Sequence, residues 1–126
     1  MAEKACVKWG GHLVSFQNKA EEDRVTKLIA TNDVRLYWIG LTERGREGNW
    51  TWTDDTEYQY NNWKAGEPNN YGGRDEDCAM INLWGVRQWF DASCDSSLYY
   101  ICKRPKGALP DHGIFSVDNG APEYAT

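Results

Sequence analysis

The sequence predicts an α+β domain built around a single hydrophobic core. Its length of 126 residues suits one domain. Helix patterns are confined to the first thirty residues or so, and short apolar strand patterns follow up to residue 103. Seven tryptophans and seven tyrosines allow so short a chain to bury a large area. We expect residues 1–106 to form the domain and residues 107–126, rich in Gly, Pro, Asp and Ala, to be a tail or linker.

Two helices are predicted near the start of the chain. The first spans about 3–9 and ends at Gly10-Gly11. The second spans about 18–31, where Asn18 is the N-cap and Glu21 its capping-box partner. Its apolar stripe consists of Val25, Leu28 and Ile29. Its polar residues are expected to face water, and they are Glu22, Asp23, Arg24 and Lys27.

Strands are predicted after the second helix. Residues 37–41 form a continuous apolar run typical of a buried strand, and residues 49–53 alternate as a half-buried strand does. No period is detectable from residue 54 to 77, which predicts a long loop, and such loops in compact domains are usually functional. Shorter strands are expected at 79–83, 87–90 and 98–103.

The cysteines indicate disulfides and not a metal site. No two of the four are spaced as Cys-x-x-Cys, and the two histidines do not stand at ligand spacing, so zinc is disfavoured. An even number in a short domain favours two disulfides and an oxidising compartment, with three pairings open and four buried free thiols as the alternative. The sequon at Asn49 agrees with an extracellular location. No apolar leader follows Met1, so we interpret the start as processed or truncated.

The composition argues against several classes of function. The net charge is −5 and no basic run exists, which disfavours nucleic acid and anionic membranes as partners. Apolar runs are far too short for membrane insertion. Nucleophilic hydrolysis needs Ser or Cys, His and an acid in contact, and we interpret His12 and His112 as structural or incidental. The consecutive acids at 75–77 do not flank a substrate, so we predict no enzyme activity.

Oxygen-bearing side chains gather in residues 66–78, which read GEPNNYGGRDEDC. Pro68 and the glycines at 72 and 73 prevent a helix here. Calcium takes six to eight oxygen ligands and tolerates irregular geometry. The segment therefore suits a calcium ion, whereas a solvated acidic loop is the alternative interpretation.

Ordered motifs along residues 6–103 resemble those of one family. They are Gly10-Gly11-His12-Leu13-Val14-Ser15, Trp38-Ile39-Gly40-Leu41, Trp50 and Trp52, Asn62-Trp63, Glu67-Pro68-Asn69, Glu76-Asp77-Cys78, Trp89-Phe90-Asp91-Ala92-Ser93-Cys94, and Ile101-Cys102. Together they resemble a C-type lectin-like domain.

The resemblance implies an α+β fold in which two helices flank small antiparallel sheets, a long calcium-binding loop leaves and re-enters the core, and disulfides join Cys6 to Cys102 and Cys78 to Cys94. The strand that usually opens this fold is not apparent, so the edge at 98–103 would be bare and prone to self-association. Either residues 113–117 fold back over it, a partner chain covers it, or the tail is a flexible linker.

The resemblance also implies a calcium-dependent site for glycans or glycoproteins on a secreted protein or receptor ectodomain. The main calcium ligands, which also bind two adjacent sugar hydroxyls, would be Glu67, Asn69, Glu76 and Asp91. The Glu-Pro-Asn motif implies mannose, N-acetylglucosamine or fucose-type hydroxyl geometry. A second calcium site would use Glu43, Glu47, Asn70 and Asp77 beside Glu76; the alternative is that Glu43 and Glu47 are exposed loop acids.

One departure from the family pattern concerns the main site. The usual Trp-Asn-Asp is Trp89-Phe90-Asp91 here, which removes a calcium ligand and a donor to sugar. About seven oxygens remain once two sugar hydroxyls are counted, still within the calcium range. Phe90 either packs against a neighbour or offers a face to a sugar ring. The rival function is a lectin-like domain that binds protein, with calcium structural or absent.

We expect Trp38, Trp50, Trp52 and Trp63 in the core and Trp84 near the loop.

Overall fold

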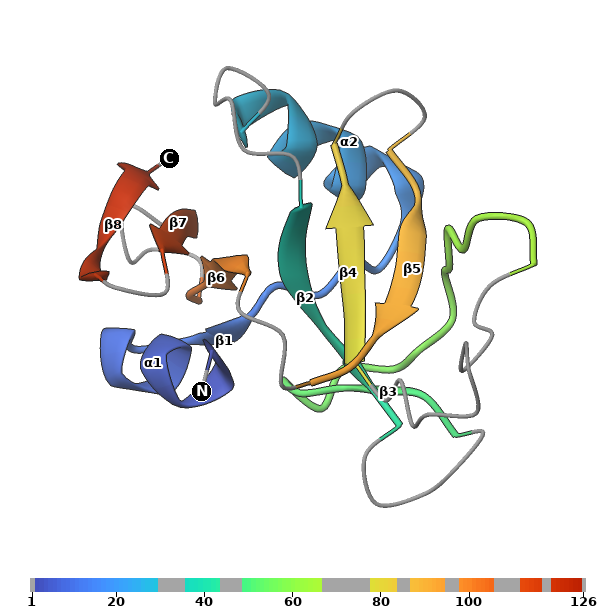
Figure 1. Cartoon of the computed structure of the whole chain (residues 1–126), viewed down its shortest axis with the longest axis horizontal. Helices are drawn as coiled ribbons and strands as arrows, with labels where there is room; N and C mark the ends of the chain where they lie inside the picture. Colours follow the sequence, from blue (N-terminus) through green and yellow to red (C-terminus); the bar gives the residue numbers. More distant parts are fainter. Residues whose placement is uncertain are drawn as a thin grey trace.

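The computed structural model describes residues 2–29, 36–43, 49–66, 78–83, 87–94, 98–105, 112–116 and 119–125. Two helices and eight strands are seen in this part of the chain (Figure 1). They are α1 (Ala2–Trp9), β1 (His12–Leu13), α2 (Lys19–Ile29), β2 (Leu36–Thr42), β3 (Thr51–Trp52), β4 (Cys78–Asn82), β5 (Trp89–Ala92), β6 (Tyr99–Lys103), β7 (His112–Ser116) and β8 (Asn119–Ala125). The predicted α+β class is confirmed.

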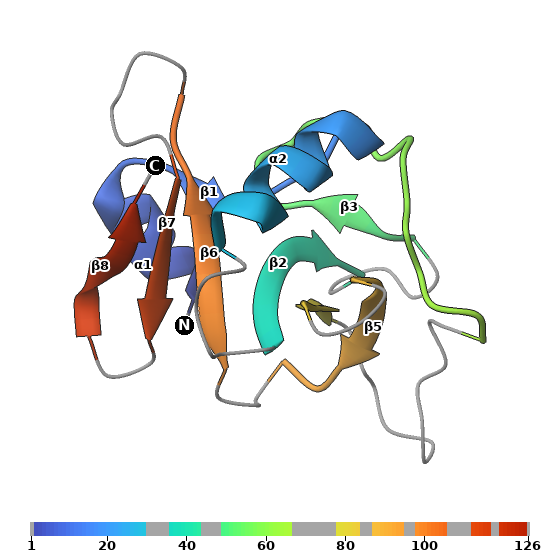
Figure 2. The same cartoon turned by 90° about the horizontal axis from the view of Figure 1, so that it is seen from above.

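The strands form one sheet in the order β5-β4-β2-β6-β7-β8, with β1 paired to β6 and β3 to β2. We expected antiparallel pairing, but β2 and β6 run parallel, with Tyr37 opposite Tyr99. The chain returns to β6 only after the long loop, β4 and β5, a connection long enough for parallel strands. Figures 1 and 2 show α1 on the side of β6, β7 and β8, and α2 on the side of β2, β4 and β5.

Both helix ends predicted from local sequence are confirmed. Gly10 has a φ of 103°, and the Gly11 amide donates to the Cys6 carbonyl at 2.9 Å, so the diglycine ends α1. A Cβ on Gly11 would lie 2.0 Å from the Lys103 carbonyl oxygen, so β6 approaches here as closely as only glycine permits. At the start of α2, the Glu21 amide donates to Asn18 Oδ1 at 2.8 Å.

Strand boundaries were predicted less well. The 49–53 strand is only Thr51–Trp52, and the pairing of β1 with β6 was not expected. The strand predicted at 87–90 is Trp89–Ala92, because Arg87 has a φ of 58°, outside the extended region, and pairing with β4 runs from Trp89 to Ala92.

The core is aromatic, as the composition predicts. Trp38, Trp50 and Trp52 are buried and Trp63 is partly buried, which confirms their structural role. Trp89 is fully buried, and its indole stacks on Phe16 with ring centroids 6.2 Å apart. Trp84 lies outside the described residues.

Both disulfides have the pairing that the family resemblance implied. Cys6 and Cys102 are joined across 96 residues of sequence, and Cys78 and Cys94 across 16. Cys6 and Cys102 are fully buried, whereas Cys78 is half-buried where β4 begins. One bridge thus holds α1 to β6, and the other holds the start of β4 to the end of β5.

The segment after residue 111 folds back over β6, as one of our alternatives expected. Ile114 of β7 lies opposite Ile101 of β6, and the buried Phe115 ring stacks on Tyr100 with centroids 5.4 Å apart. His112, which we had interpreted as structural or incidental, is buried there, in agreement with a structural role. The linker interpretation is therefore wrong for residues 112–116, because Phe115 completes the apolar cluster around Cys6 and Cys102. The edge of β6 that suggested self-association is paired, and the domain boundary at residue 106 stays a prediction.

No helix within the described residues is both long and apolar enough to cross a membrane.

Candidate ligand-binding site

Cys78 begins β4 directly after the predicted oxygen-rich loop, and two predicted ligand acids each lie one residue from its register partners on β2 and β5. Thr42 on β2 and Ala92 on β5 are both register partners of Cys78. Glu43 directly follows Thr42, and Asp91 directly precedes Ala92. The sheet therefore brings acids from β2 and β5 to the point where the oxygen-rich loop ends.

These two acids are buried. Asp91 is 5 % exposed and Glu43 is 4 % exposed. The alternative in which Glu43 is an exposed loop acid is therefore wrong, because the end of β2 lies against β4 and β3, where its side chain is shielded from water. Buried carboxylates are stabilised by hydrogen bonds, opposite charge or a metal ion. Burial of Asp91 and of Glu43 is therefore compatible with the main and the second predicted calcium site, respectively.

The other predicted ligands lie outside the described residues: Glu67, Asn69, Glu76 and Asp77, and also Glu47 and Asn70. Within the described ranges, no three His, Cys, Asp or Glu side chains group together as a metal site. The calcium ligand sets therefore stay predictions. Asp91 and Glu43 are the two predicted ligands that lie within the described residues.

Phe90, which stands where the family usually has asparagine, is half-buried beside Asp91. It lies opposite Met80 on β4. The Lys64 ammonium sits over its ring, with Nζ 5.4 Å from the centroid. The ring thus has neighbours on two sides, which agrees better with packing than with a free platform for sugar.

The stretch just before the predicted loop ligands is fastened to β5 by its backbone. The Trp89 amide donates to the Asn62 carbonyl at 2.9 Å, and the Lys64 amide donates to the Trp89 carbonyl at 3.0 Å. Trp63 accordingly forms a parallel bridge with Trp89. The approach to Glu67 and the strand that carries Asp91 therefore have a fixed register.

Glu22 of α2 contacts the residues that form this register. Our expectation that it faces water is therefore wrong. It is 2 % exposed. Its Oε1 accepts hydrogen bonds from Tyr60 Oη at 2.6 Å and Asn62 Nδ2 at 3.0 Å, and its Oε2 accepts one from Trp89 Nε1 at 2.6 Å. Asn62 Nδ2 also donates to the Arg87 carbonyl at 2.9 Å. One carboxylate is thus hydrogen-bonded both to β5 and to residues 60–64, the segment before the predicted loop ligands, which we call the loop base.

The sequence contained the signal for this burial. Glu22 precedes Val25 by three residues and Thr26 by four, so all three share one helix face. Val25 and Thr26 are both buried. We had given more weight to charge than to helical spacing. The buried Trp89 and the partly buried Tyr60 and Asn62 donate hydrogen bonds that offset the cost of burying that charge.

Burial raises the pKa of Glu22 above its ordinary value, and this outweighs the lowering by the bonds from Tyr60, Trp89 and Asn62 and by the charge of Lys19. Burial also raises the pKa of the Tyr60 hydroxyl, and its bond to Glu22 raises it further, so this hydroxyl remains a donor. The other charged groups nearby are Asp23 on α2 and Arg87, whose Nη1 lies 3.4 Å from Thr26 Oγ1.

A pH dependence of stability follows from Glu22. Because its pKa is higher in the folded state, folding takes up a proton at pH values between the unfolded and folded pKa. The resulting stabilisation is fully present below the ordinary pKa of 4.5 and is lost as pH rises through the folded pKa. Glu22→Gln should therefore gain stability relative to wild type as pH rises through this window. Urea unfolding at a series of pH values measures this. A difference that stays constant with pH contradicts it, and Asp23→Asn, an exposed acid on the same helix, is the control.

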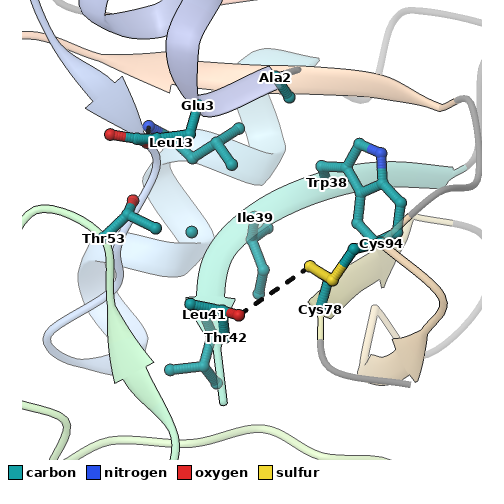
Figure 3. A pocket seen from close by; sticks show the side chains of 11 residues that line it. Ala2, Glu3, Leu13, Trp38, Ile39, Leu41, Thr42, Thr53, Cys78 and Cys94 are labelled. Atoms are coloured by element: carbon teal, nitrogen blue, oxygen red, sulfur yellow. Dashed lines mark hydrogen bonds between the residues drawn. A yellow bond between two sulfur atoms is a disulfide. The ribbon is translucent and has the colours of Figure 1, made fainter. Parts of the chain in front are cut away.

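An apolar cavity of about 260 Å³ lies between the first turn of α1, β2 and the Cys78–Cys94 disulfide. Figure 3 shows Trp38 and the disulfide on one side of it and Glu3, Leu13 and Thr53 on the other. Glu3 is occupied there as an acceptor, because its Oε1 receives the Leu13 amide at 2.9 Å and its Oε2 lies 2.6 Å from His12 Nδ1. His12 therefore has a structural contact, as expected.

Asn49, the predicted glycosylation site, is exposed.

A sheet whose long loop is fastened by one disulfide, with the chain start fastened to β6 by another, defines the C-type lectin-like fold. The chain belongs to this family: residues 1–104 match the model described as "Lectin C-type domain". It is 41 % identical over 108 residues to human "C-type lectin domain family 4 member K", covering 82 % of this chain and 32 % of that protein. The chain thus spans about a third of this relative's length.

Solved structures agree in fold. The cow C-type carbohydrate-recognition domain of CD23, solved "in the presence of GlcNAc2Man3 oligosaccharide", matches with a TM-score of 0.70 and 38 % identity, covering 80 % of this chain and 74 % of that one. A "calcium-independent type II antifreeze protein" matches with a TM-score of 0.70 and 30 % identity, covering 80 % and 73 %. Similar structures therefore include a carbohydrate-recognition domain and a protein described as independent of calcium.

Proposed function

We propose that this domain binds carbohydrate through calcium, with mannose, N-acetylglucosamine or fucose-type specificity. The observation that carries the proposal is the burial of Asp91 and Glu43, each one residue from a register partner of Cys78, which directly follows the segment that contains Glu67, Asn69 and Glu76. The similar CD23 domain was solved in the presence of GlcNAc2Man3 oligosaccharide, a glycan that contains mannose, which supports the same class of ligand. Glycans on glycoproteins outside the cell are the partners that this function implies.

In this mechanism Asp91 and the side chains of Glu67, Asn69 and Glu76 would hold the ion, which would supply open coordination positions for two adjacent sugar hydroxyls. The ion supplies positive charge that makes the gathered carboxylates mutually tolerable. The carboxylate oxygens of this chain also accept hydrogen bonds from those hydroxyls, and bonds to charged acceptors are the stronger kind. The chain itself contributes the placement of Asp91, fixed by pairing of β5 with β4 and with residues 62–64.

The experiment is a calcium titration by calorimetry, alone and with mannose, together with glycan binding in the presence of a chelator. We expect calcium binding, mannose binding that a chelator abolishes, and a loss of calcium affinity of roughly ten- to a hundredfold in Asp91→Asn, since a bond to a charged group contributes roughly 1.5–3 kcal/mol. Asp55→Asn is the matched control, because Asp55 is exposed and has a φ of 66° that asparagine adopts readily. Equal losses in both variants, or chelator-resistant mannose binding, would contradict the proposal.

The second candidate is a lectin-like domain that binds a protein partner, and Phe90 favours it. A ring flanked by Met80 and Lys64 cannot donate a hydrogen bond to sugar. Phe90→Asn distinguishes the two candidates. On the carbohydrate proposal it strengthens calcium and mannose binding, because it adds an oxygen ligand and an amide donor. If wild type binds neither ligand and Phe90→Asn restores neither, the protein-binding function is favoured.

A further inference from the structure

We propose that Glu22 is a positioning residue for the ligand site: its buried carboxylate holds residues 60–64 of the loop base against β5, next to Asp91. This inference rests on the proposed calcium-dependent function. Glu22 does not touch the predicted ligands, but it contacts the segments that lead to them. Its side chain reaches residues 38, 40 and 67 positions away in sequence, at Tyr60, Asn62 and Trp89.

The first step of the argument concerns Trp89. Its indole Nε1 donates to Glu22 Oε2, and its backbone carries both the bond to Asn62 and the bond to Lys64. Asp91 lies two residues further along the same strand. Glu22 therefore fixes the indole ring of Trp89, and the backbone of Trp89 sets the register of the loop base on β5.

The second step concerns the loop base itself. Tyr60 and Asn62 donate to Oε1, the other carboxylate oxygen. The loop base and β5 are therefore both hydrogen-bonded to Glu22 of α2. Lys64 is three residues before Glu67. A shift of residues 60–64 along β5 would therefore move the segment that leads to Glu67 relative to Asp91.

The third step is that no neutral replacement reproduces this arrangement. A carboxylate presents two acceptor oxygens to three donors. Glutamine presents one acceptor and one donor, so either the indole N–H or the pair from Tyr60 and Asn62 would face an amide N–H. Partners that orient metal ligands from outside the coordination sphere typically contribute 10–100-fold in metal affinity.

The experiment compares Glu22→Gln with Asp23→Asn, which removes the same charge from an exposed position one residue away. Calcium affinity is measured by calorimetry at a temperature where circular dichroism shows each variant to be folded. We expect roughly tenfold weaker calcium binding in Glu22→Gln and less than about twofold change in Asp23→Asn, because the exposed Asp23 carboxylate pairs with Lys19 on the same helix at 3.4 Å. Equal affinity in folded Glu22→Gln and wild type would overturn the inference.

Two readouts separate positioning from a general loss of stability. The Trp89 indole N–H resonance should move upfield in Glu22→Gln as its short bond to the carboxylate is lost. Amide exchange should accelerate at Lys64 and Trp89 but not at Val14 or Gly40. The Val14 amide donates to the Ile101 carbonyl on β6 and the Gly40 amide donates to the Val14 carbonyl, so both bonds lie elsewhere in the core. Uniform acceleration at all four amides would indicate a purely structural role and overturn the inference.

If Glu22→Gln does not fold, Tyr60→Phe removes one donor and keeps the ring; we expect about threefold weaker calcium binding, and an unchanged affinity would overturn the inference. A wild-type protein that binds no calcium would refute the proposed function. In that case the amide-exchange comparison, which needs no ion, still decides whether Glu22 holds residues 60–64 against β5.

Discussion

Replacing Cys6 and Cys102 together by alanine should lower the free energy of unfolding by about 4–5 kcal/mol, because the bridge closes a loop across 96 residues. The same double replacement at Cys78 and Cys94, which are 16 residues apart, should cost about 3 kcal/mol by the same chain-entropy relation. A domain of this size has a total of roughly 5–15 kcal/mol, so the first variant would lose at least about a quarter of its stability.

Urea unfolding of both variants at one pH and temperature measures the two costs, and each variant serves as the control for the other. A Cys78/Cys94 variant that is the less stable of the two would contradict the loop-length argument. Their functional effects should run in the opposite order. The shorter bridge lies where the 67–77 loop rejoins the sheet beside Asp91, so we expect calcium affinity to suffer more from its removal.

Replacing Trp89 by alanine should cost about 3–5 kcal/mol of folding stability, the range for truncating a fully buried large aromatic side chain. Its ring contacts Phe16, Trp52, Tyr60 and Trp63, with centroids 5.6–6.2 Å away. Deleting it leaves a cavity where the helix, the loop base and β5 meet, and it leaves Glu22 Oε2 without its donor.

Trp89→Phe separates the two contributions. Phenylalanine retains most ring contacts but has no N–H, so we expect a smaller cost of about 1–3 kcal/mol, the desolvation penalty of a buried acceptor without its partner. Denaturant unfolding of both variants measures the difference. Equal costs would mean that the hydrogen bond to Glu22 accounts for the whole effect, and a negligible cost in Trp89→Phe would mean that the bond contributes nothing to stability.

Trp89 and Glu22 together connect α2, β5 and residues 60–62. The carboxylate accepts bonds from the indole N–H, the Tyr60 hydroxyl and the Asn62 amide, while its raised pKa records the remaining cost of burial.

Local chemistry determined much of the fold. Asn18 and Glu21 define the start of α2 and Gly10-Gly11 the end of α1, because capping depends on groups within a few residues of each other. The apolar run at 37–41 is β2, since a strand buried on both faces needs no polar alternation. Family motifs implied the disulfide pairing, which the residues alone had left open among three arrangements.

Tertiary structure decided the rest. The parallel pairing of β2 with β6, the return of Phe115 onto Tyr100, and the burial of Glu22 and Glu43 all depend on contacts between residues far apart in sequence. Local pattern cannot predict them, because a charged side chain is buried only where the fold supplies donors, and a strand edge is covered only where another segment reaches it. The amino-acid sequence alone determined where α1 ends and where α2 begins, because capping is local. Only the folded chain decided which acids are buried, since hydrogen-bond partners and strand register arise from packing.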